Sequence, residues 1–147
     1  MNSELVNVLL ISERAEGASL LRQRLTQRGC ECYVATSSAQ AARLFAGHEF
    51  DLVLCTFWMQ GMSTLIPVLI GSGASLFRSV AVEDSCWWMP AVRHGEECVG
   101  APALRASEFK VALDRIVGEI KARRRFTSGL SNWGVTSEQR LIEVAMR

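Results

Sequence analysis

The residues of this chain that could do chemistry gather around one short apolar run. Thr56 follows the run Leu52–Cys55, so a thiol and a hydroxyl stand at the end of a predicted strand. A catalytic cysteine needs a histidine base. His48 precedes the same run and falls at its opposite end, while His94 lies in a charged segment typical of a surface. We therefore expect Cys55 to be buried and Thr56 to satisfy local hydrogen bonds, and we assign no catalytic residue.

Patterns for binding phosphate or metal are equally sparse. The Gly-Ser-Gly segment at 71–73 lacks the Gly-Lys-Ser/Thr ending of a phosphate-binding loop. Glu13, Glu83 and Asp84 could converge at one edge of a parallel sheet and hold a cation, but solvated loop acids are the simpler explanation. The five cysteines contain no Cys-x-x-Cys pair, as is typical of reduced thiols. We predict no metal and no cofactor.

The composition limits the classes of function. With 147 residues, 49% of them hydrophobic, the chain suits one domain with a sizeable core. Sixteen basic and fifteen acidic side chains give a charge of +1, so no overall field favours nucleic acid or a membrane surface. No apolar stretch reaches the ~18 residues of a membrane span. The N-terminus lacks the basic start and cleavage site of a secretory signal, so we expect a cytoplasmic protein.

Strand and helix patterns alternate along the chain. Apolar runs typical of buried parallel strands cover residues 6–11, 32–35, 52–55, 79–82 and 98–101. Helical patterns cover residues 18–28, 37–47, 65–70 and 107–120. The segment 84–97 shows no clear stripe and is predicted as an irregular loop or a poor helix. This alternation implies right-handed crossovers and a parallel sheet with helices on both faces.

The last helical pattern is the clearest, and its apolar stripe ends at Ile120. A polar linker follows at 127–134, and Thr136 with Gln139 predicts a short tail helix. We divide the chain into a domain of residues 1–120 and a basic linker with tail helix, 121–147. Because an isolated short helix is marginal in water, the tail must pack on this subunit or on a second copy.

Residues 6–120 resemble the response-regulator receiver domain, and the segment 51–62 carries the likeness most directly. In that family the third strand ends in the aspartate that accepts phosphate, and a Met-Pro-x-Met turn follows. Here Met59 and Met62 occupy the two methionine positions, and a glutamine replaces the proline. The phosphoacceptor position falls on Thr56, so a hydroxyl replaces the carboxylate.

The rest of the family's phosphorylation site is also eroded. Its acidic pair after the first strand matches Ser12 and Glu13, which keep one acid. Its lysine before a proline matches Ala101, which stands beside Pro102. The family's hydroxyl residue after the fourth strand maps ambiguously to residues 83–85. The resemblance implies a flavodoxin-like three-layer sandwich, with a five-stranded parallel sheet in the order 2-1-3-4-5 and a C-terminal extension.

Phosphorylation of an aspartate needs a carboxylate nucleophile, a divalent ion and a nearby cation. Since most of these parts are missing, the resemblance implies a phosphorylation-independent pseudo-receiver that is not an enzyme. We expect it to act in signalling or transcriptional regulation through protein contacts, as a homodimer with a further partner that the sequence does not name. One alternative is a nucleic-acid-associated regulator using the basic C-terminal segment. A weaker alternative is a metal-dependent enzyme using the strand-end acids.

Two segments are candidates for the contact surface. Trp87, Trp88 and Met89 either fold onto the core or face a partner, and we predict the second. The basic run of Arg123, Arg124 and Arg125 could touch phosphate groups, but three arginines at a helix end also complement the helix dipole, which is the explanation we favour.

Overall fold

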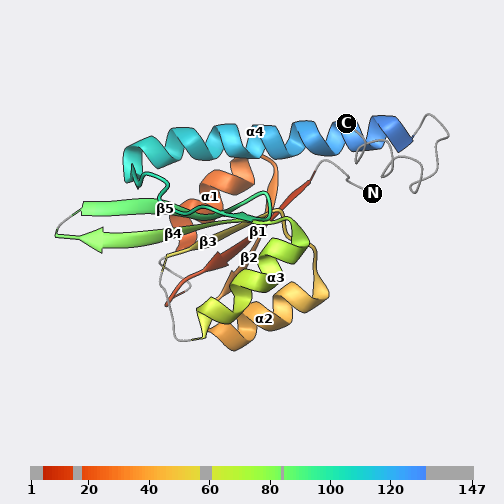
Figure 1. Cartoon of the computed structure of the whole chain (residues 1–147). Helices are drawn as coiled ribbons and strands as arrows, with labels where there is room; N and C mark the ends of the chain where they lie inside the picture. Colours follow the sequence, from red (N-terminus) through yellow and green to blue (C-terminus); the bar gives the residue numbers. More distant parts are fainter. Residues whose placement is uncertain (1–4, 15–17, 57–60, 84, 132–147) are drawn as a thin grey trace.

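The computed structural model describes residues 5–14, 18–56, 61–83 and 85–131, with side chains described as far as Arg123. Helices lie on both faces of a mainly parallel sheet (Figure 1). Among the described residues the strands run in the order β2-β1-β3-β4-β5-β6, and β7 pairs with β5. The elements are β1 (Val6–Ile11), α1 (Ser19–Gln27), β2 (Cys30–Ala35), α2 (Ser38–Gly47), β3 (Leu52–Cys55), the 3-10 helix η2 (Met62–Thr64), α3 (Leu65–Ser72), β4 (Ser75–Val82), β5 (Ser85–Arg93), β6 (Glu96–Glu97), β7 (Leu104–Arg105) and α4 (Ala106–Ser131).

The first four strands are parallel, as the alternation predicted. The strands predicted at 6–11 and 52–55 are confirmed, while β2 and β4 begin earlier than predicted. In β1, Val8 and Leu10 join the cluster that packs under α1 and α4, whereas Leu9 and Ile11 join the cluster under α2 and α3. Burial on both faces explains why this strand is an almost continuous apolar run.

The helix predicted at 37–47 begins as its capping pattern indicated. The Ser37 hydroxyl accepts a hydrogen bond from the Gln40 amide at 3.1 Å, and the Gln40 side chain accepts one from the Thr36 amide at 2.9 Å. The first bond satisfies an amide that the first turn leaves without a partner, and the second joins the residue before the cap to the helix.

The fifth strand is not the one predicted. Residues 98–101 form no strand, and the segment predicted as a loop contains β5, which runs antiparallel beside β4. A hairpin needs only two connecting residues, whereas a parallel strand needs a crossover of a dozen or more. The sheet is therefore mixed and has seven strands in the described part of the chain, where we predicted five parallel ones.

A bulge explains why β5 was missed in the sequence. Its register with β4 shifts between Leu76 and Phe77, which face Val92 and Pro90. Pro90 cannot donate a backbone hydrogen bond, and it lies between the segments of β5 that pair with β7 and with β6. The shift interrupts the alternation of inward and outward side chains by which a strand is recognised.

Trp88 belongs to the core, which corrects our prediction that it faces a partner. Its side chain is 6% exposed, and its ring stacks on Phe109 at 4.4 Å between centroids and 10° between planes. The Phe77 ring packs against the same phenylalanine, with 5.5 Å between the ring centroids. Trp87 is half-buried, with the Arg105 guanidinium 5.5 Å above its ring, and Met89 is 38% exposed.

Helix α4 continues past the predicted domain boundary at residue 120. Its predicted stripe is confirmed, since Phe109, Leu113, Ile116, Val117 and Ile120 are all buried. The helix runs to Ser131, so residues 127–131 of the predicted linker are helical. The predicted tail helix lies outside the described residues. In the part of the chain that the structure describes, no helix is both long and apolar enough to cross a membrane.

Two glycines in left-handed conformations provide a matched test of packing between α3 and the turn before β6. Gly95 has φ +85°, and an added Cβ would lie 2.9 Å from the Ile70 carbonyl oxygen. Gly73 has φ +84°, but an added Cβ would meet nothing within 4 Å. Both alanine variants lose roughly 1–2 kcal/mol for the backbone conformation, and we expect Gly95→Ala to lose more in urea denaturation because α3 must also shift. Equal losses of stability in the two variants would contradict the close approach of Gly95 to the Ile70 carbonyl.

Candidate functional site

The strand ends that would carry a phosphorylation site in a receiver are occupied by hydroxyl groups bonded to the main chain. The pairing of Ile11 with Cys55 places Ser12 and Thr56 at the ends of adjacent strands. Ser12 is 4% exposed, and its hydroxyl donates to the Arg14 carbonyl at 2.8 Å. The Thr56 hydroxyl donates to the Ile11 carbonyl at 3.1 Å, and its amide donates to the same oxygen at 2.8 Å. Thr56 thus makes the local hydrogen bonds that we expected.

The acids considered for a cation site do not form one in the described residues. Glu13 and Glu83 are exposed, and Asp84 lies outside the described part of the chain. Among the residues described, no group of three or more His, Cys, Asp or Glu side chains could hold a metal ion. The strand-end acids therefore offer no support for the metal-dependent alternative.

The neighbour of Thr56 in the sheet is Ser79, which the sequence did not indicate. Cys55 pairs with Arg78, so the residues that follow them on these parallel strands lie side by side. The Ser79 hydroxyl is 3.5 Å from the Cys86 sulfur. Ala101 instead lies between β6 and β7 and does not end a parallel strand. We missed Ser79 because the strand was predicted to begin there, four residues later than β4 does.

The basic run lies inside α4 and not at its end. Arg123 is exposed, and the helix continues beyond Arg124 and Arg125 for more than one turn. The last turn contains no basic residue, so our expectation that the run complements the helix dipole is wrong.

The pKa of His94 lies below its usual value. The main cause is partial burial of the imidazole, and the nearby positive charges of Arg123 and Arg93 add to it.

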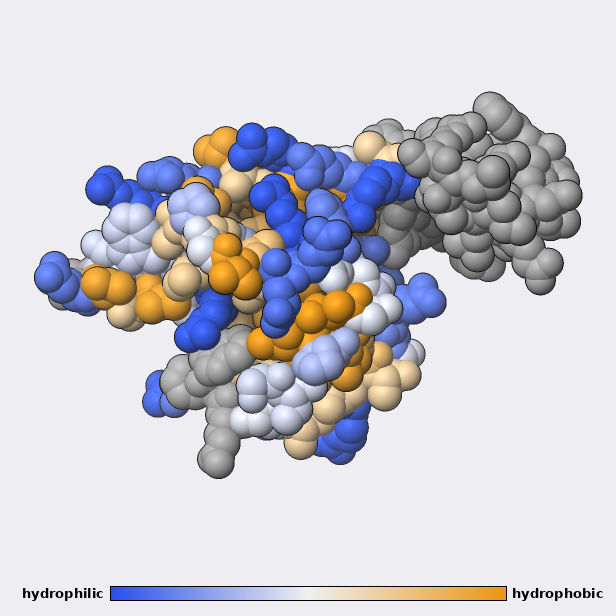
Figure 2. Space-filling view, viewed as in Figure 1, coloured by the Kyte–Doolittle hydropathy of each residue, from blue (hydrophilic) through white to orange (hydrophobic). Residues whose placement is uncertain are grey.

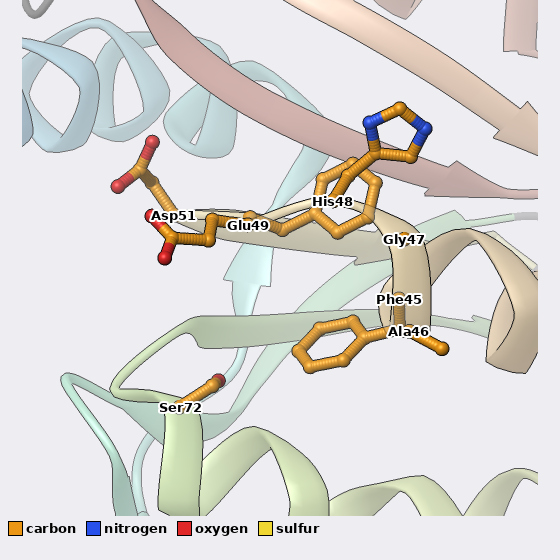
Figure 3. Close-up of a pocket in the computed structure, with 8 residues that line it drawn as sticks. Phe45, Ala46, Gly47, His48, Glu49, Asp51 and Ser72 are labelled. Atoms are coloured by element: carbon orange, nitrogen blue, oxygen red, sulfur yellow. The ribbon is translucent and has the colours of Figure 1, made fainter.

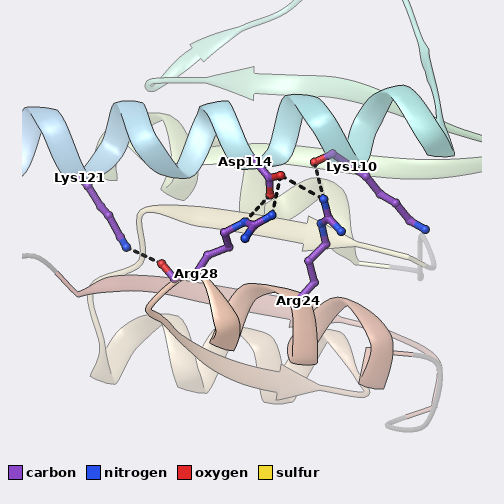
Figure 4. Close-up of polar contacts among 5 residues, drawn as sticks. All are labelled: Arg24, Arg28, Lys110, Asp114 and Lys121. Carbon is purple, nitrogen blue, oxygen red and sulfur yellow. Dashed lines mark hydrogen bonds and ion pairs between the residues drawn. The ribbon is translucent and has the colours of Figure 1, made fainter.

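A polar clamp joins α1 to α4 (Figure 4). The Arg28 guanidinium donates two hydrogen bonds of 2.8 Å to the Asp114 carboxylate, and Arg24 donates a third at 3.1 Å. The hydrogen bond from Arg28 raises the guanidinium pKa and holds the Asp114 pKa below its ordinary value. Lys121 donates to the Arg28 carbonyl. The clamp fixes the position of α1 on the long helix.

A groove opens between α1 and α4 at the end of β3, beside the clamp. It has a volume of about 530 Å³. We call this the α1–α4 groove, and it is lined by Leu20, Leu21, Gln23, Arg24 and Gln27 from α1, by Thr56, Ser79, Cys86 and Trp88 from the sheet, and by Ala106, Phe109 and Lys110 from α4. The groove combines an apolar wall with hydroxyl, amide and cationic groups, and sequence reasoning did not find it because its parts come from four separate segments.

A second pocket of about 520 Å³ lies at the opposite edge of the sheet, where β3 begins (Figure 3). The carboxylates of Glu49 and Asp51 lie on one side of it, whereas the His48 ring points away from them. Asp51 accepts a hydrogen bond from the Asn7 amide at 3.0 Å, and His48 packs on Tyr33 at 4.6 Å between ring centroids. Since these polar groups hold local structure and do not converge, we assign no chemistry to this pocket.

Comparisons with known proteins identify one structural likeness. No family model matches the sequence, and no curated protein matches it. The solved structure of a response regulator receiver domain protein from Clostridium thermocellum is similar, with 22% sequence identity and a TM-score of 0.44. The match covers 50% of this chain and 64% of that protein, which is less than two thirds of its length.

Proposed function

We propose that this chain is a phosphorylation-independent pseudo-receiver that acts in signal transduction or transcriptional regulation through protein contacts. The observation that carries the proposal is the type of side chain that follows β1 and β3. Ser12 and Thr56 present hydroxyl groups that donate to main-chain carbonyl oxygens, so neither position supplies the carboxylate that phosphorylation of an aspartate requires. An ionised carboxylate at either position would carry no proton and could not donate a hydrogen bond to the main-chain carbonyl.

Exposed apolar side chains support a role in binding other proteins. Val68 and Ile70 on α3 are 49% and 36% exposed, and Figure 2 shows apolar surface gathered over this helix. Met89 adds exposed apolar surface on β5. Surfaces of this kind often mark protein contacts. We propose that they bind a different protein.

The test is treatment of the protein with acetyl phosphate and magnesium, followed by intact-mass spectrometry. We expect no added phosphate, and we expect beryllofluoride with magnesium to leave the melting temperature unchanged. The matched control is Thr56→Val, which keeps the shape of the side chain but lacks the hydroxyl. A stoichiometric phosphate adduct in the parent protein that is absent from Thr56→Val would overturn the proposal.

A further inference from the structure

We propose that the α1–α4 groove binds a small organic anion with an apolar body. This inference goes beyond the proposed function, because it assigns a small-molecule site to a chain that we otherwise describe by its protein contacts.

The groove exists because neighbouring strands differ in length. β3 ends at Cys55, while β4 and β5 continue as a hairpin beyond the residues that pair with it. On the α1 and α4 side of this overhang the sheet presents the small side chains of Thr56, Ser79 and Cys86, which leave the space above them unfilled. A volume of about 530 Å³ lies within the range of roughly 300–1,000 Å³ typical of sites for small ligands.

An apolar wall faces this floor. Leu20 is 79% exposed at the mouth of the groove, and Leu21 is half-buried beside it. The stacked rings of Trp88 and Phe109 close the inner end. An aromatic or acyl group of the ligand would cover Leu20 and release the water that now contacts it, which is the main source of affinity in such sites.

The charges at the rim favour an anion. Arg24 and Lys110 line the groove, and none of the described residues that line it carries a carboxylate. Asp114 neutralises part of the arginine charge from outside the groove, but the same carboxylate also binds Arg28, so the cluster keeps a net positive charge. The Lys110 ammonium makes no hydrogen bond or ion pair with any described residue and is exposed. It is the group best placed to meet a carboxylate or sulfonate.

Contacts at both ends hold the walls of the groove in place. The clamp to Asp114 fixes α1 against α4 at one end, and the stack of Trp88 on Phe109 fixes the hairpin against α4 at the other. A rigid site avoids the entropy cost of ordering its walls on binding.

The test uses two probes with the same aromatic body and opposite charges, naphthylacetate and naphthylmethylamine. Cys86 is exposed and lines the groove, so a bound probe should shield it from iodoacetamide. Cys98 lies outside the groove and serves as the internal reference. At about ten times its dissociation constant, naphthylacetate should slow Cys86 alkylation by about tenfold, as measured by peptide mass spectrometry, and the amine should have no such effect.

Burial raises the pKa of Cys32 to about 11, so its thiol should contribute little to the labelling near neutral pH.

Three exposed positions then locate the site. Leu20→Glu and Lys110→Glu each place a negative charge at the rim and should weaken naphthylacetate binding by about tenfold. Val111→Glu puts the same charge on α4 outside the groove, where the valine is 69% exposed, and should bind like the parent protein. All three variants should keep the parent melting temperature because their side chains face solvent.

The inference would be overturned if naphthylacetate did not protect Cys86 or if the amine protected it equally. It would also be overturned if Val111→Glu lost as much naphthylacetate binding as the two rim variants. None of these outcomes depends on whether Thr56 accepts phosphate, so the two proposals fail separately.

Discussion

Trp88→Ala should lower the free energy of unfolding by about 3–5 kcal/mol, the range measured when large aromatic side chains are removed from cores. The indole is 6% exposed and lies against Phe109 in a parallel stack. Its removal would leave a cavity where β5 meets α4, and neither element can close it without losing other contacts. Urea denaturation followed by circular dichroism measures this loss.

Trp87→Ala is the matched control for Trp88→Ala. The neighbouring indole is half-buried and carries the Arg105 guanidinium 5.5 Å above its ring, a contact worth about 1 kcal/mol or less at an exposed site. We therefore expect a small change. If Trp88→Ala kept the parent stability and weakened self-association instead, the indole would belong to an interface and our assignment to the core would be wrong.

Two truncations within α4 should separate the part of the helix that folding requires from the part that it does not. A chain ending at Arg115 lacks Ile116, Val117 and Ile120, which are 6%, 3% and 2% exposed. At about 1.5–3 kcal/mol for each buried side chain, the loss is comparable to the whole stability of a typical domain. We expect this truncation to be unfolded by circular dichroism.

A chain ending at Arg123 keeps all the α4 residues that are buried in the part of the helix whose side chains are described, and it keeps the Lys121 contact to α1. We expect it to melt like the full chain. We also propose that self-association uses residues beyond 123, so light scattering should report a smaller assembly. A molten or insoluble protein would show instead that residues 124–147 complete the core, and the proposed role of these residues in self-association would then be wrong.

Local patterns in the sequence were enough to predict the parallel part of the fold. The runs of β1 and β3 are apolar, apart from Asn7 in β1, because both faces of each strand are buried. The Ser37 cap and the stripe of α4 from Phe109 to Ile120 act within a few residues of chain, so they can be seen without knowledge of any distant partner. The hydrogen bond of the Thr56 hydroxyl was also predicted, but its partner, the Ile11 carbonyl, lies on the neighbouring strand and is supplied by the sheet.

Contacts between distant segments decided the rest. The direction of β5 depends on its pairing with the open edge of β4, and the bulge near Pro90 removes the periodicity that would have shown it. From the sequence we predicted that Trp88 faces a partner, whereas the position of α4 over the hairpin buries it. The α1–α4 groove arises from the different lengths of β3 and β4. Such features could not be derived locally, because each depends on how segments far apart in sequence come together in the folded chain.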